Sequence, residues 1–220
     1  MNKMNITVTI KYFAAFIILI LLVSKCATSN YYTAQTLKKG EKALSPGFDN
    51  LFLYDMKDKD NTFGFSPSFG YIHGLPHRFE TGLRYYFPFV LEGMVRNQLN
   101  PPSFKTFDIS INLHVGIRYY FDDDGVNIFD EYIKPGLTIS KEICEYQPFI
   151  SYYRMYPEYS IGDEETTKTY MNSVFAFGLA IPYKNDFIIP EINYQCRISN
   201  LSEGAFFIGI GIRTFINKKK

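Results

Sequence analysis

The sequence predicts an all-β protein, a single antiparallel up-and-down transmembrane β-barrel of about ten strands that follows an N-terminal signal segment. Three observations predict it. Apolar and polar residues alternate in one segment after another, as in strands with two different faces. Long and short connections between these segments alternate along the chain. The polar faces combine small residues with charges of both signs, which is typical of a narrow barrel interior.

The composition fits one domain and argues against some partners. The chain has 220 residues, with 23 basic and 22 acidic side chains and a formal net charge of +1. This balance, without a basic stripe, gives no reason to expect a nucleic-acid partner. The 18 Tyr and 21 Phe residues, with no Trp, favour strands and membrane interfaces. About 180 residues remain after the leader, a length that suits one domain.

The first 26 residues predict export. Lys3 and Lys11 give a basic start, and residues 12–24 form an apolar run of thirteen. This run is shorter than the ~20 residues of a spanning helix and suits a secretory signal. The letters LLVSKCATS resemble the lipobox of bacterial lipoproteins and make Cys26 the candidate lipidation site, although Lys25 replaces the usual small residue. An uncleaved N-terminal anchor is the alternative.

Residues 107–118 show the strand pattern most clearly. Their sequence, FDISINLHVGIR, alternates apolar and polar residues without interruption, so successive side chains point to opposite faces. Comparable runs recur along the chain, each near the ~9–11 residues of a tilted membrane strand. The first run is weaker because Pro46 and Gly47 interrupt it, and the seventh is aromatic on both faces. The candidate strands are residues 42–54, 63–73, 78–87, 89–99, 107–118, 132–143, 146–156, 171–181, 186–198 and 206–215.

The connections between the strands alternate in length. Long, charged connections follow the first, fifth and seventh strands, and short ones follow the second, fourth, sixth and eighth. Outer-membrane barrels have this layout, with long outer loops and tight periplasmic turns, and an even strand number places both termini in the periplasm. The short third connection, at Pro88, departs from the rule. The candidate sites for an extracellular ligand are the long loops at residues 55–62, 121–131 and 157–169.

The two faces of the strands decide which side is the interior. One face carries bulky apolar side chains, whereas the other carries Gly, Ala, Ser, Asn and charges of both signs. Glycine weakens a solvated strand but fits a narrow lumen, where opposite charges pair. The apolar face is therefore expected to contact lipid. The predicted lumenal polar network consists of Arg78, Glu80, Arg84, Glu92, Arg96, Asp108, His114, Arg118, Lys134, Glu191, Arg197 and Arg213.

Two short motifs resemble those of small outer-membrane β-barrel proteins, often lipoproteins, of Gram-negative-type bacteria. Residues 33–40 match a TA-x-TL-x-KG stretch that follows the lipidated cysteine in these proteins. Residues 207–215, FIGIGIRTF, resemble the C-terminal signal that the barrel-insertion machinery recognises, although INKKK follows Phe215 here. The resemblance implies the outer membrane as location, with its lipid and the insertion machinery as partners. It implies no particular activity.

Four regions follow from these patterns. Residues 1–26 are a signal peptide or lipoprotein leader, and residues 27–42, with the polar sequence ATSNYYTAQTLKKGEK, are predicted to be a periplasmic linker. Residues 43–216 form the predicted barrel, and residues 217–220 are a basic tail. No later segment reaches ~18 apolar residues, so no helical span is expected after the leader.

The histidines give little support for catalysis. Omptin-type outer-membrane proteases place Asp and His at the extracellular rim. His73 and His77 instead flank a short turn expected at the periplasmic end, and His114 is expected to face the lumen in mid-strand. No acid–base pair converges on one site. We therefore expect no enzyme activity, no catalytic residue and no cofactor.

The acidic residues and the cysteines predict neither a metal site nor a disulfide. Asp122 and Asp124 match the start of a calcium loop, but the next glycine comes too early, so a solvated loop is the better interpretation. Three cysteines are an odd number without a CxxC motif. We therefore expect Cys144 and Cys196 to be free, and we expect no metal site.

Two classes of function remain open. The first hypothesis is a non-enzymatic outer-membrane barrel with a structural or surface-binding role, which conducts at most through a narrow conduit. The alternative is an exported or lipid-anchored soluble β-barrel that binds a small apolar ligand, and an omptin-like protease is a third hypothesis. The lumen discriminates between the first two, because a cavity for an apolar ligand is lined mainly by apolar side chains.

Overall fold

The computed structural model describes residues 31–55, 60–62, 66–87, 90–101, 104, 106–121, 127–158, 172–197 and 200–217. The predicted leader with Cys26, and parts of the three long loops, lie outside the described residues. The same holds for Asp122 and Asp124.

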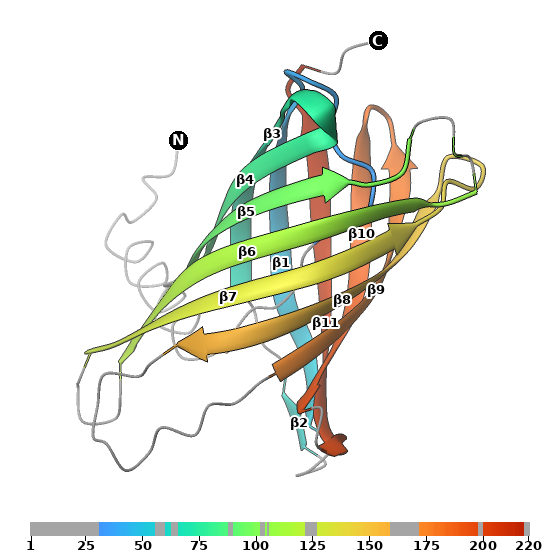
Figure 1. Ribbon diagram of the computed structural model, residues 1–220. Coiled ribbons are helices and arrows are strands. Elements are labelled where there is room, and N and C mark those ends of the chain that lie inside the picture. Colours follow the sequence, from blue (N-terminus) through green and yellow to red (C-terminus); the bar gives the residue numbers. More distant parts are fainter. Residues whose placement is uncertain are drawn as a thin grey trace, which may run out of the picture.

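The described strands form one closed antiparallel barrel (Figure 1). Each long strand pairs with its neighbours in the chain, and the first pairs with the last, which closes the sheet. A short strand, β2 (Asp60–Thr62), pairs with the far end of the first strand, and a 3-10 turn, η1 (Pro76–Arg78), precedes the third long strand. The long strands are β1 (Lys42–Asp55), β3 (Ser66–Gly74), β4 (Phe79–Tyr86), β5 (Val90–Gln98), β6 (Asp108–Phe121), β7 (Asn127–Ser140), β8 (Gln147–Glu158), β9 (Asn172–Tyr183), β10 (Asp186–Arg197) and β11 (Asn200–Phe215).

These ten long strands confirm the predicted up-and-down barrel. The main differences lie at the long-loop end. The hairpin of β6 and β7 continues until Phe121 faces Asn127, so residues 127–131 are strand where the sequence predicts loop. β11 likewise begins six residues earlier than predicted, at Asn200 instead of residue 206. Ladder hydrogen bonds extend these strands beyond the part whose alternation is visible in the sequence.

The two ends of the barrel differ. The short connections at residues 75–78, 141–146 and 184–185 all lie at one end, here called the short-turn mouth. β1 begins there and β11 ends there, and the Ile216 N–H donates a hydrogen bond of 2.9 Å to the Lys42 carbonyl. The C-terminus therefore leaves from this end (Figure 1). Among the described residues, no helix is long and apolar enough to cross a membrane.

β6 shows which face is the interior. Ile111, Leu113 and Val115 point outward and are 48, 45 and 49% exposed. Asn112 and His114, between them, are almost fully buried. Large apolar side chains also cover the outside of the other strands, such as Phe69, Leu83, Ile139, Phe177 and Ile192. The barrel is therefore apolar outside and polar inside, the reverse of a water-soluble barrel.

Aromatic side chains cover glycines on the inner wall. Gly116 in β6 faces Tyr132 in β7, and a Cβ at Gly116 would lie 2.2 Å from the tyrosine ring. Gly136 in β7 and Tyr153 in β8 form a second pair with the same spacing. A side chain at either glycine would displace the ring, so these positions require glycine. The pairing also explains why β8, aromatic on both faces, turns Phe149 and Tyr153 inward.

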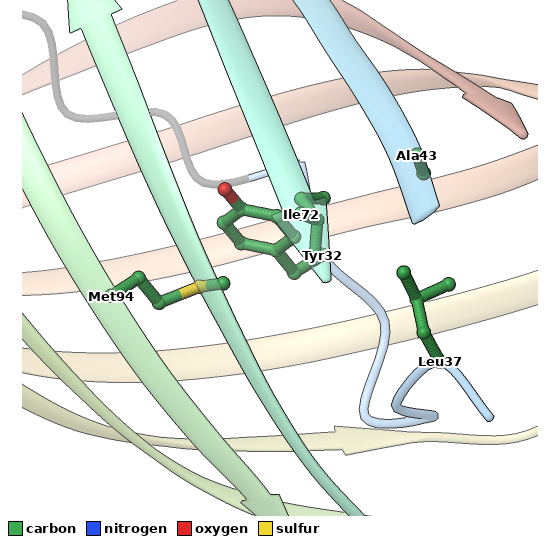
Figure 2. Packing of buried hydrophobic residues seen from close by; sticks show 5 residues of the cluster. All are labelled: Tyr32, Leu37, Ala43, Ile72 and Met94. Atoms are coloured by element: carbon green, nitrogen blue, oxygen red, sulfur yellow. The ribbon is translucent and has the colours of Figure 1, made fainter. Parts of the chain in front are cut away.

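A small apolar cluster lies inside the barrel near the short-turn mouth (Figure 2). Ala43, Ile72 and Met94 come from β1, β3 and β5. Tyr32 and Leu37 complete the cluster and come from the segment that precedes β1. The interior is therefore filled in part by residues that do not belong to the barrel wall.

Candidate functional site

Residues 31–41, here called the lumenal segment, lie inside the barrel. Tyr31, Tyr32, Thr33 and Ala34 are each at most 2% exposed, and Leu37 is 5% exposed. The sequence-based prediction of a periplasmic linker over residues 27–42 did not anticipate this position. Two adjacent tyrosines bring enough apolar surface to favour burial, even though the stretch as a whole is polar.

The lumenal segment enters through the short-turn mouth. The Gly40 N–H donates to the Gly74 carbonyl at the end of β3, at 2.8 Å. Towards its N-terminus the segment reaches deeper, because Tyr31 contacts Asp49 and Glu191, which lie well inside β1 and β10. The chain thus extends from the mouth towards the middle of the lumen.

Side chains of the wall accept hydrogen bonds from the backbone of the lumenal segment. The Tyr31 N–H donates to Glu191 Oε2 at 2.8 Å, and the Leu37 N–H donates to Glu80 Oε2 at 2.9 Å. The Ala34 N–H donates to Ser140 Oγ at 3.0 Å. Hydrogen bonds to carboxylates are stronger than those between neutral groups, so these contacts hold the backbone firmly.

Two arginines of the wall donate to the carbonyl groups of the same segment. Arg96 donates from Nη1 to the Thr33 carbonyl at 2.7 Å and from Nη2 to the Gln35 carbonyl at 3.1 Å. Arg96 also forms a fully buried ion pair with Glu80, with 2.9 Å between Nη2 and Oε1. Arg213 donates to the Tyr31 carbonyl at 3.4 Å. The charged wall and the segment therefore form one hydrogen-bonded unit.

Tyr31 fits a recess made by two glycines. Its ring lies over Gly47 in β1 and Gly211 in β11, where added Cβ atoms would come within 2.6 and 2.4 Å of it. Its hydroxyl donates to Asp49 Oδ1 at 2.6 Å, with the Phe48 carbonyl at 2.9 Å. The recess therefore matches both the shape of the ring and its polar end.

Tyr32 lies among three guanidinium groups. The Cζ atoms of Arg84, Arg96 and Arg213 are 4.7, 4.9 and 5.7 Å from the centre of its ring. Each distance lies within the ~6 Å range of a cation–π contact. Arg84 also donates to Ser45 Oγ at 2.7 Å. An aromatic ring at position 32 thus offsets part of the cost of placing several cations close together.

A second charged cluster centres on Glu92 and contains wall residues only. Lys134 Nζ lies 3.0 Å from Glu92 Oε2, and His114 Nδ1 lies 2.9 Å from Oε1. The hydroxyl groups of Tyr132 and Tyr86 donate to the same carboxylate at 2.7 and 3.3 Å. The carboxylate is thus surrounded by four donor groups in a buried site, where a buried charge needs such partners.

The predicted lumenal network is placed as follows. Asp108 and Arg118 are half-buried, and Arg78 lies in η1, where it donates to the Asn100 carbonyl. The Arg197 side chain lies outside the described residues. The fully buried members are Glu80, Arg84, Glu92, Arg96, His114, Lys134, Glu191 and Arg213.

Sequence reasoning missed the aromatic part of this site. Tyr31 and Tyr32 lie in the predicted linker, and Tyr132, which donates to Glu92 and shares the face of Lys134, is absent from the predicted network. An adjacent pair of aromatics in a polar stretch was the available signal for the first two. The alternation of residues 132–138 was the available signal for Tyr132.

Two hollows of about 580 and 410 Å³ open at the short-turn mouth. Both are lined by residues 35–38 of the lumenal segment, and the second reaches Thr33 and Arg213. Lys38 and Lys39 are exposed there. The segment is therefore reachable from this end of the barrel.

The three histidines lie in three different elements. His73 lies next to the last residue of β3, near the short-turn mouth, His77 lies in η1, and His114 lies in mid-strand in β6 and faces the lumen. No group of three or more His, Cys, Asp or Glu side chains in the described parts of the chain is arranged to hold a metal ion. Cys144 and Cys196 are both free thiols, the first exposed and the second buried.

No protein-family model and no curated protein matches the chain. Solved structures are similar to it at low identity. The β domain of the Bordetella autotransporter BrkA is 9% identical, with a TM-score of 0.47, over 80% of this chain and 99% of that one. The transport unit of the Escherichia coli autotransporter AIDA-I is 10% identical, with a TM-score of 0.43, over 92% of this chain and 97% of that one. The Yersinia pestis outer membrane protein Ail in a phospholipid nanodisc is 14% identical, with a TM-score of 0.33, over 80% of this chain and 99% of that one.

Because these similarities are weak, the class of the protein is taken from its own residues. The sheet is closed between β1 and β11. Its outer face is apolar, and its interior is charged and occupied in part by the lumenal segment. These properties define a transmembrane β-barrel of the antiparallel up-and-down type.

Proposed function

We propose that the chain is a non-enzymatic protein of the bacterial outer membrane whose lumen is closed by its own lumenal segment. Its role lies in the membrane or at the cell surface, as a structural component or a binder, and not in conduction. The observation that carries the proposal is the reversed barrel, with Leu113 facing outward and His114 fully buried beside it.

The filled lumen supports a closed barrel. A barrel of about eight strands is filled by its side chains, and only much larger barrels leave an aqueous channel. Here the segment occupies a lumen of similar size, and its backbone is bonded to Glu80, Arg96 and Glu191. We therefore expect the protein to conduct little, if at all.

The two other hypotheses have less support. A soluble barrel for an apolar ligand would have an apolar cavity, whereas this interior holds buried Glu92, Lys134 and Arg96 and a peptide segment. A protease of the omptin type would need His and Asp at the outer rim, whereas His73 and His77 lie towards the short-turn mouth.

The surface role is assigned to the three regions that the sequence predicts as long loops, residues 55–62, 121–131 and 157–169, parts of which the structure describes as strand. All three leave the barrel at the end opposite the short-turn mouth, which we place at the cell surface. The short-turn mouth then faces the periplasm, where the leader would release the chain. Lipidation of Cys26 and recognition of β11 by the insertion machinery belong to the same proposal.

Membrane fractionation tests the location. After removal of the leader, the chain should remain with outer membranes through a carbonate wash and should run as a heat-modifiable band. Release into the soluble fraction would contradict the proposal. In planar bilayers, the folded protein should give no stable open conductance.

A fluorophore on a single cysteine tests the orientation of the wall. We propose Ile111→Cys, labelled before folding, in a chain whose three native cysteines are replaced by Ser. Brominated lipid should quench this probe and aqueous iodide should not, because Ile111 is 48% exposed on the apolar face. Glu145→Cys, in an exposed turn, is the matched control and should show the opposite response. Protection of position 111 from both quenchers would indicate a dry core and overturn the assignment.

A further inference from the structure

The contacts of the lumenal segment have an unusual composition. Four of its N–H groups and three of its carbonyl groups are bonded to side chains of the barrel wall. The donors are the N–H groups of Tyr31, Ala34, Thr36 and Leu37, and the acceptors are the carbonyls of Tyr31, Thr33 and Gln35. Backbone groups are common to all polypeptides, so these hydrogen bonds recognise the main chain independently of most of its side chains.

The wall also provides recesses for particular side chains. Tyr31 occupies the recess at Gly47 and Gly211, and Tyr32 lies among the arginines. Leu37 packs in the apolar cluster near the mouth. These recesses select two adjacent aromatic residues followed, five positions later, by an aliphatic one. Main-chain hydrogen bonds with side-chain recesses are the general features of a peptide-binding site.

We propose that the lumen is a binding site for a short polypeptide segment and that residues 31–41 are its intramolecular ligand. The site holds such a segment without needing a covalent connection to β1. A segment of another polypeptide with the same chemistry, two adjacent aromatics in an otherwise small and polar stretch, enters the same site from the short-turn mouth when residues 31–41 are absent from it. The proposal depends on the closed barrel and not on a role at the cell surface.

The short-turn mouth gives access to the connection between ligand and barrel. Lys38 and Lys39 are exposed, and Gly40, with φ of 81°, makes the turn that leads into β1. Because both hollows open beside residues 35–38, this connection is accessible to a protease. Cleavage there would break the covalent connection between the ligand and the wall and leave the described strands intact.

The test uses the folded full-length protein in detergent micelles, with a site-specific protease sequence inserted between Lys39 and Gly40. After cleavage, gel filtration shows whether the N-terminal fragment stays with the barrel. A fluorescein-labelled synthetic peptide of residues 31–39 is then added, and its binding is followed by fluorescence anisotropy. The heat-modifiable band verifies that the barrel is still folded.

We expect the fragment to co-elute with the barrel, or the labelled peptide to bind saturably in its place. Uncleaved protein should bind at least tenfold less peptide. Loss of the fragment from a folded barrel that does not bind the added peptide would overturn the proposal. So would saturable binding of the peptide to the uncleaved protein with the affinity seen after cleavage, because the peptide would then bind elsewhere.

Two sets of variants locate the binding in the lumen. A peptide with both tyrosines replaced by Ala should bind at least tenfold more weakly. Glu191→Gln in the wall should weaken the parent peptide about tenfold, because it removes the charged acceptor of the Tyr31 N–H. Glu145→Gln, at an exposed position in a turn of the same mouth, is the control and should leave the affinity unchanged. If Glu145→Gln had the larger effect, the peptide would be binding at the rim. A chain that is not membrane-bound would refute the outer-membrane function, whereas this assay in micelles measures the lumen alone.

Discussion

The two carboxylates of β4 and β5, Glu80 and Glu92, differ in where their partners come from. Glu92 contacts Lys134 and His114, both from the wall. Glu80 contacts Arg96 from the wall but also the Leu37 N–H of the lumenal segment. One cluster is therefore complete in the barrel alone, and the other is complete only with the segment in place. The Glu92 cluster, with Lys134 and His114, is here called the permanent core. The Glu80 cluster, with Arg96 and the Leu37 N–H, is called the occupant-dependent cluster.

The largest loss of stability is expected from a substitution of Glu92 in the permanent core. Glu92→Gln removes the charge that balances buried Lys134, and breaking a buried ion pair by removing one partner costs about 3–5 kcal/mol. We expect a loss of this order in the free energy of unfolding, measured by urea titration of the protein in lipid vesicles with gel mobility as readout. The loss should be the same before and after cleavage between Lys39 and Gly40. A loss that disappears after cleavage would contradict the independence of this cluster.

A smaller loss of stability is expected from a substitution of Glu80 in the occupant-dependent cluster. Glu80→Gln also breaks a buried ion pair. Arg96 keeps the Thr33 and Gln35 carbonyls as acceptors, however, so the expected loss is at the lower end of the same range, about 3 kcal/mol. The same urea titration should show a loss in this range for the intact chain. Unlike Glu92→Gln, this variant should also make the N-terminal fragment dissociate faster after cleavage. If both variants released the fragment equally, the two clusters would not be separate.

The smallest effect is expected from Tyr31→Phe. This change keeps the ring in the recess at Gly47 and Gly211 but removes the hydroxyl that donates to Asp49. The free energy of releasing the lumenal segment from its site should fall by about 1–3 kcal/mol, because Asp49 loses a buried donor. The loss should be seen as faster proteolysis after Lys38 and Lys39, with little change in the unfolding of the strands. Tyr31→Ala, which also empties the recess, should accelerate proteolysis further.

The sequence was sufficient for the wall of the barrel because lipid imposes a strict pattern on it. In β6 every second residue must be apolar, so Leu113 and His114 could be assigned to opposite faces from alternation alone. β8 carries aromatics on both faces, so its own sequence did not orient it. Its orientation depends on Gly136 in the neighbouring strand, which leaves space for Tyr153.

The position of the lumenal segment inside the barrel could not be predicted from local sequence patterns. Residues 31–41 have no alternation, and their burial depends on partners far along the chain, such as Glu191 and Arg213. The predicted lumenal network includes those two residues, but alternation does not indicate that part of the network faces a peptide backbone. Which charges pair with one another, and which pair with the segment, depends on register and on the tilt of the strands.

The lumenal segment also has a consequence for the order in which the protein folds. Its contacts with Glu191 and Arg213 join residues 160 and 182 positions apart. Contacts over such separations form late, because the entropy of closing the intervening loop must first be offset by other interactions. β1, which directly follows the segment, must itself pair with β11 before the wall around Tyr31 is complete. We therefore expect the burial of Tyr31 to follow the closure of the barrel.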